Sequence, residues 1–135
     1  NAFQFLDLLN YYKLTDHKMC CQILIKIAAY LSTGVTEHDH CRYNCYKDVP
    51  EVNYWTAAIA TALHHAHEFK FGDYKEISER AYQHVLAKQR NDGGFDFSTK
   101  DYGLLWDKRS YPRYLAMIHN HLLYRALLEP HEFRS

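Results

Sequence analysis

Hydrophobic positions recur every three or four residues through most of the chain, the spacing that places apolar side chains on one face of an α-helix. Lys18, Gln22 and Lys26 fall four residues apart, so they predict a narrow polar stripe on an otherwise apolar helix. Together the patterns predict five helices, over residues 2–13, 16–31, 49–69, 74–90 and 111–129.

The third predicted helix has no charged residue on any face between Tyr54 and Leu63, so we expect protein to surround it. Asp48 precedes it as the cap, with Pro50 in its first turn and Glu51 at the capping-box position, and together they predict its start.

The fourth predicted helix has a clear inner and outer face. Ile77, Ala81 and Val85 are spaced to face the core, whereas Arg80 and Lys88 are spaced to face water. This amphipathic pattern is typical of a helix on the outside of a helical layer.

Short and long connections alternate between the predicted helices. The short turn at residues 12–18 resembles the one at residues 69–75, and the two long loops cover residues 32–48 and 91–109. Tight turns join antiparallel helices, so both long loops should emerge at the same end. Loops of this length in a compact domain are usually functional.

The end of the fourth helix carries Leu86 and Gln89, followed by the run Asp-Gly-Gly-Phe at residues 92–95. The glycines let the chain leave the helix with positive φ, Gln89 can hydrogen-bond the loop backbone, and Phe95 can pack back against the hairpin. This pattern resembles the repeat signature of the α/α-toroid superfamily, which includes protein prenyltransferase β subunits and squalene and terpene cyclases.

The resemblance covers roughly residues 2–129 and implies an all-α fold of antiparallel α-helical hairpin repeats, a partial α/α-toroid. We expect one toroid-like domain over residues 1–135, which is part of a larger toroid because two and a half hairpins are too few to close one. Self-association or the remainder of a longer chain would complete it.

The first long loop gathers histidine and cysteine. Imidazole and thiolate are ligands that zinc prefers. Four side chains of this loop could form a zinc site: His38, His40, Cys41 and Cys45. Asp39 and Cys41 resemble the Asp-x-Cys zinc pair of prenyltransferase β subunits, but the later inner helix begins without the matching histidine at residues 110–114.

The second long loop interleaves aromatic residues with Asp and Arg, a composition that suits carbohydrate binding because rings stack on sugars and charged groups bond hydroxyls. Paired carboxylates could perform acid–base chemistry, although a structural lid has the same composition. The candidate catalytic residues are Asp39, His40, Tyr102, Asp107 and Arg113. The candidate substrate-binding residues are Arg42, Tyr43, Tyr54, Trp55, Asp101, Trp106, Arg109 and Tyr111.

Charge and composition narrow the class of partner. Lys+Arg and Asp+Glu balance at 16 each, so the chain lacks the basic surplus of a nucleic-acid-binding protein. The apolar stretch at residues 19–31 is too short to span a membrane. The four cysteines do not form a dense disulfide framework, which favours a reducing compartment and predicts a cytoplasmic location.

Three functions remain open at this point. The first is a carbohydrate-processing domain that binds a glycan where residues 32–48 and 91–109 meet. The second is a protein similar to prenyltransferases or terpene cyclases that binds an isoprenoid-like ligand, and the third is a non-catalytic helical domain that completes a larger assembly. Whether the chain is an enzyme stays open, because the Asp-rich motifs of terpene synthases and squalene cyclases are absent.

Overall fold

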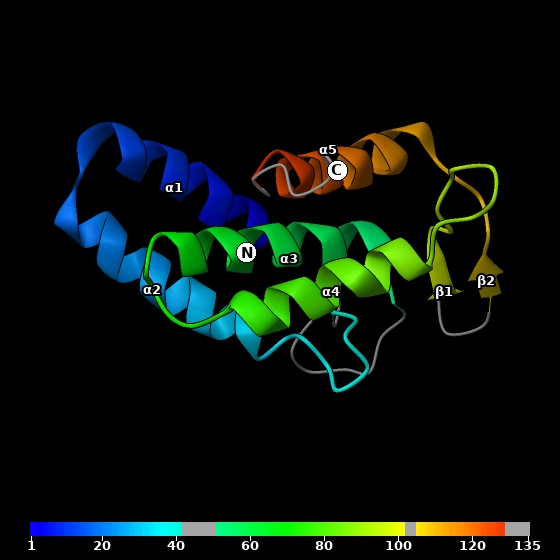
Figure 1. The fold of residues 1–135 in the computed structure, drawn as a ribbon, viewed down its shortest axis with the longest axis horizontal. Helices are drawn as coiled ribbons and strands as arrows, with labels where there is room; N and C mark the ends of the chain where they lie inside the picture. The colour runs from blue at the N-terminus through cyan, green and yellow to red at the C-terminus, as the bar shows by residue number, and fades with distance from the viewer. Residues whose placement is uncertain (42–50, 102–104, 129–135) are drawn as a thin grey trace, which may run out of the picture.

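The computed structural model of the chain describes residues 1–41, 51–101 and 105–128, which form an all-α fold with one short antiparallel strand pair. Within these residues the chain follows the predicted order of helices (Figure 1). The elements are α1 (Ala2–Thr15), α2 (Lys18–Ser32), α3 (Asn53–Glu68), α4 (Lys75–Ala87), β1 (Ser98–Asp101), β2 (Leu105–Asp107) and α5 (Pro112–Leu128).

The α3 helix lies at the centre and packs against α1, α2, α4 and α5 (Figure 1). Ten of its 16 residues are buried, and most of these are small. The buried small residues are Thr56, Ala57, Ala58, Ala60, Thr61, Ala62 and Ala66. Short side chains let neighbouring helices approach closely on several sides, which confirms that α3 is surrounded by protein.

The short turns and the long loops lie at opposite ends of α3, as the alternation of connections predicts. At the short-turn end, Tyr12 packs edge-on against Phe71 with ring centroids 5.9 Å apart. At the other end, Val52 pairs with Ser98 in an isolated antiparallel bridge, so the segment that follows the first long loop meets the second long loop there.

The Asp-Gly-Gly-Phe turn after α4 adopts the expected conformation. Gly93 has a φ of 80°, and the Gln89 side chain donates a hydrogen bond to the Gly93 carbonyl at 3.3 Å. Phe95 is buried against Ala57 and Val85. The turn therefore anchors the second long loop to the core, and beyond it β1 and β2 form a small ribbon that the sequence did not indicate.

The start of α3 differs from the prediction, because Glu51 lies outside the helix and does not act in a capping box. Val52 is extended, with φ −123° and ψ 111°, and occupies the N-cap position. Its pairing with Ser98 holds the backbone extended until Asn53, where the helix begins. Asp48 and Pro50, the other residues of the predicted capping box, lie outside the described residues.

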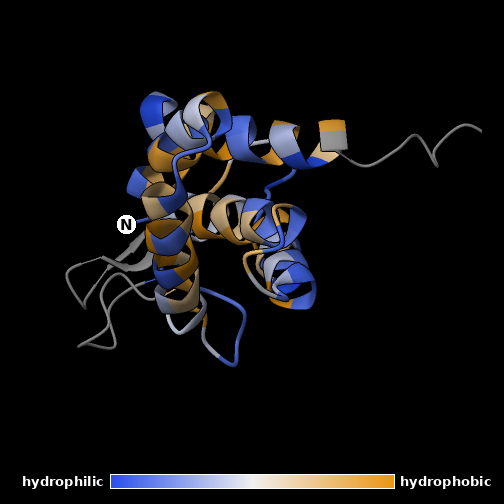
Figure 2. Ribbon diagram, turned by 90° about the vertical axis from the view of Figure 1, so that its left-hand side faces the viewer, coloured by the Kyte–Doolittle hydropathy of each residue, from blue (hydrophilic) through white to orange (hydrophobic). Residues whose placement is uncertain are grey.

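Large apolar side chains remain exposed on several helices, among them Leu14 on α1, Met19 and Ile23 on α2, and Leu123 and Leu127 on α5. The exposed face of α2 is therefore wider and more apolar than the polar stripe that the sequence predicts. Figure 2 shows the resulting mixture of hydrophobic and polar residues along the helices. Among the described residues, no helix has the length and apolar content needed to cross a membrane.

Replacing Leu63 with Ala tests the central position of α3. Leu63 is 0 % exposed in the main core, so Leu63→Ala should lower the free energy of unfolding by about 2–5 kcal/mol, measured by urea denaturation. Leu14→Ala is the matched control, because Leu14 is 87 % exposed and its truncation should change stability by less than about 0.5 kcal/mol. Equal effects of the two substitutions would contradict the packing described here.

A buried histidine on α5 should make stability depend on pH. Burial lowers the pKa of His121 to about 4, well below the value of about 6.5 for an unfolded chain. Between these values the unfolded state binds the proton and the folded state does not, so stability is full above about pH 6.5 and falls as pH drops towards 4. From pH 5.5 to 4.5, the unfolding free energy of the parent chain should fall by about 1.4 kcal/mol more than that of His121→Phe. Parallel pH profiles of the two proteins would contradict this burial.

Candidate functional site

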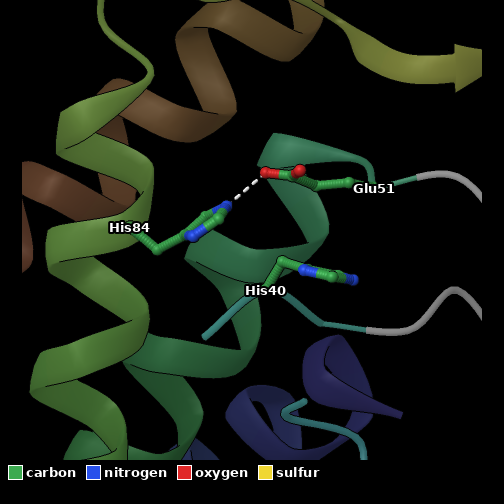
Figure 3. Close-up of side chains that lie close together, drawn as sticks. All are labelled: His40, Glu51 and His84. Atoms are coloured by element: carbon green, nitrogen blue, oxygen red, sulfur yellow. Dashed lines mark hydrogen bonds and ion pairs between the residues drawn. The ribbon is translucent and has the colours of Figure 1, made fainter. Parts of the chain in front are cut away.

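Three chemically reactive side chains from separate segments meet beside the start of α3 (Figure 3). His40 comes from the first long loop, Glu51 from the residues just before α3, and His84 from α4. One nitrogen or oxygen atom from each of the three lies within 4.8 Å of the other two. His84 Nε2 is hydrogen-bonded to Glu51 Oε1, and Lys88 Nζ lies 3.8 Å from Glu51 Oε2. We call His40, Glu51 and His84 the His–Glu cluster.

One face of α4 supplies the partners of two acidic residues, Asp39 and Glu51. Arg80, His84 and Lys88 are four residues apart, so their side chains follow one stripe of the helix. Arg80 Nε lies 3.1 Å from Asp39 Oδ1, while His84 and Lys88 contact Glu51. Arg80 is exposed as the sequence predicts, but Lys88 is half-buried because it faces Glu51 rather than open water.

The backbone of residues 35–41 folds into a compact turn that presents His40. The Thr36 amide donates to the His40 carbonyl at 2.9 Å, and Asp39 adopts a left-handed conformation with φ 65°. The Cys41 amide donates to Thr56 Oγ1 at 3.2 Å, which ties the turn to α3. His40 is therefore fixed between α3 and α4.

The electrostatics of the cluster favour an ionised Glu51 carboxylate beside a neutral His40 imidazole. Burial alone would raise the pKa of Glu51, but the hydrogen bond from His84 and the positive charges of His84, Lys88 and His40 outweigh it and lower the pKa. Burial lowers the pKa of His40, and the nearby charge of Glu51 opposes that shift only in part. Glu51 thus carries its charge in a largely buried position, where compensation matters.

An aromatic cluster lies on the α5 side of the start of α3. Tyr54 stacks on Tyr114 with ring centroids 4.5 Å apart, and Phe97 lies 4.9 Å from Tyr114. Tyr111 packs edge-on against Phe97 at 5.3 Å, and the Arg109 guanidinium lies 5.1 Å from the Tyr111 ring. All four rings are partly exposed. Tyr54 follows Glu51 by only three residues. The aromatic cluster and the His–Glu cluster therefore lie next to the same turn at the start of α3.

The structure brings some predicted site residues together and leaves others apart. Tyr54, Arg109 and Tyr111 belong to the aromatic cluster. Two further candidates lie beside it: the Trp55 ring is 5.6 Å from the Tyr54 ring, and the Arg113 guanidinium is 6.0 Å from the Tyr114 ring. Other candidates lie outside the described residues, namely Arg42, Tyr43, Cys45 and Tyr102. For three more, only the backbone is described, namely Asp101, Trp106 and Asp107.

The predicted zinc ligands do not share one environment. His38 is exposed, with its ring stacked 6.3 Å from that of His40. Cys41 is buried in the main core, and burial raises its pKa to about 12, so its thiol is protonated at neutral pH. His40 instead groups with Glu51 and His84, two residues that the sequence analysis missed as site residues.

Comparison of the chain with protein-family models, curated proteins and solved structures gives no match. The likeness to α/α-toroid proteins therefore rests on the sequence motif and the hairpin pattern.

Neutralising Glu51 should destabilise the chain. The Glu51 side chain is 10 % exposed and contacts His84 and Lys88, so Glu51→Gln should cost about 1–3 kcal/mol of unfolding free energy. The matched control is Glu76→Gln, because Glu76 pairs with Arg80 at 3.5 Å but is 86 % exposed. That exposed pair should contribute only about 0.3–0.5 kcal/mol. Thermal or urea unfolding of both variants measures the difference, and a Glu51→Gln loss no larger than the control would exclude a stabilising role for the ion pairs.

Proposed function

We propose that the chain contributes the binding and reactive groups of a carbohydrate-processing site at the start of α3. One observation carries the proposal: the His–Glu cluster and the aromatic cluster flank the same turn of α3, at the end where both long loops emerge. A site that processes a sugar needs both components, a surface that holds the ring and a group that moves a proton.

The aromatic cluster suits the holding role. Its rings are partly exposed and already fixed by stacking on one another, so a sugar face can pack on them with little loss of side-chain freedom. Arg109 lies over Tyr111 and adds a hydrogen-bond donor for a hydroxyl or an acid group. This placement supports the substrate-binding role expected for Tyr54, Arg109 and Tyr111.

The His–Glu cluster suits the proton-transfer role. An ionised carboxylate hydrogen-bonded to an imidazole can orient that ring for proton transfer. The toroid architecture is part of the proposal, since alternating short and long connections would place this end of α3 at the mouth of a larger ring of hairpins.

A second proposal is a non-catalytic helical domain that completes a larger assembly, either by self-association or with the remainder of a longer chain. It is favoured by the large apolar side chains exposed on α2 and α5, which include Ile23, Leu123 and Leu127. Apolar patches of this kind are common at protein contacts. This proposal needs no ligand at the start of α3.

Carbohydrate binding can be tested by titration calorimetry against a panel of neutral and uronic-acid oligosaccharides. We expect at least one to bind with a dissociation constant between about 1 µM and 1 mM. Tyr111→Ala should weaken it by about tenfold or more, because the ring contributes an edge of the aromatic cluster.

Tyr11→Ala is the control for Tyr111→Ala, since Tyr11 is an exposed tyrosine on α1 that belongs to neither cluster. Circular dichroism should show both variants folded. Equal binding by both variants would move the sugar site elsewhere. Binding of a farnesyl-type isoprenoid in place of any sugar would favour the isoprenoid alternative, and no binding of either would favour the helical-assembly proposal.

A further inference from the structure

The His–Glu cluster contains more ligand-type atoms than charge compensation requires. Lys88 and His84 already contact Glu51, yet the first long loop brings His40 into the same group. We propose that His40, Glu51 and His84 bind one divalent transition-metal ion of the zinc class and leave one coordination position open. The inference concerns the same cluster as the proposed function: the ion would replace the hydrogen bond between His84 and Glu51, and only what the ion does there rests on that function.

The ligand set has the composition of a catalytic zinc site. Two imidazoles and one carboxylate provide three protein ligands, and a water molecule or substrate takes the fourth tetrahedral position in sites of this type. Zinc-bound nitrogen and oxygen atoms lie about 3.3 Å from one another in a tetrahedron. The three groups lie within 4.8 Å, so side-chain adjustments of about 1.5 Å would suffice.

The surroundings hold two of the ligands in place without metal. The Thr36 hydroxyl lies 3.3 Å from His40 Nδ1 and donates to the His40 carbonyl at 3.1 Å. His84 projects from the regular helix α4, whose preceding turn is tied to the loop by the ion pair between Arg80 and Asp39. Contacts of this kind orient metal ligands and strengthen binding.

Lys88 distinguishes a metal site from a purely structural ion-pair network. Its ammonium lies 3.8 Å from Glu51 Oε2, so it competes with a cation for that carboxylate. Lys88→Met removes the competing charge and should tighten zinc binding about three- to tenfold. A cluster with only a structural role would lose an ion pair and gain no affinity for zinc.

Zinc titration of the purified chain by calorimetry, and cobalt substitution followed by visible absorption, test the proposal without any carbohydrate. We expect one ion per chain, with tetrahedral cobalt bands. His84→Ala and His40→Ala should each weaken binding more than about 100-fold, whereas Thr36→Val should weaken it about tenfold. His38→Ala is the matched control, because His38 neighbours the cluster but is exposed and is not one of the three ligands.

Two results would overturn the proposal. The first is a parent chain that binds zinc no better than His84→Ala while both are folded by circular dichroism. The second is binding lost in Cys45→Ser but retained in His84→Ala, which would assign the ion to the histidines and cysteines of the first long loop. Repeating the sugar titrations with and without a chelator separates this proposal from the carbohydrate proposal, because either binding event can fail alone.

Discussion

Burial of α3 on all sides is the constraint from which the other features follow. A helix packed against four others must be narrow, so its buried positions are mostly alanine and threonine. Each buried polar group must also find a partner. Thr61 meets this demand inside the core, where its hydroxyl lies 2.8 Å from the Tyr82 hydroxyl.

The same requirement at the start of α3 recruits both long loops. The Asn53 side chain donates to the Asp96 carbonyl at 2.7 Å, and Thr56 Oγ1 accepts from the Cys41 amide at 3.2 Å. One contact fixes the second loop and the other fixes the first, on either side of one helical turn. The hydrogen bonds of the buried Asn53 and Thr56 side chains thus position the aromatic cluster and His40.

Helix number, alternation of connections and the central place of α3 were predictable, because each depends on periodic apolar residues or on a turn motif such as Asp-Gly-Gly-Phe. The site was less predictable. Glu51 fits a capping box in sequence. Its neighbour Val52 pairs with Ser98, so the helix begins after Glu51 and leaves it outside. The spacing of Arg80, His84 and Lys88 was visible, but a stripe of charged residues also suits a solvated face, and nothing local indicates that loop acids cover it.

The position of Glu51 explains why one cluster can support both proposals for its chemistry. A largely buried carboxylate needs a partner close by, and here two side chains from α4, His84 and Lys88, contact Glu51. One partner can therefore be exchanged without leaving the charge uncompensated. A proton shared with His84, or a divalent ion in place of Lys88, preserves the balance. Because any such ligand binds only the folded arrangement of three separate segments, its binding energy also stabilises the contacts that hold the loops to α3.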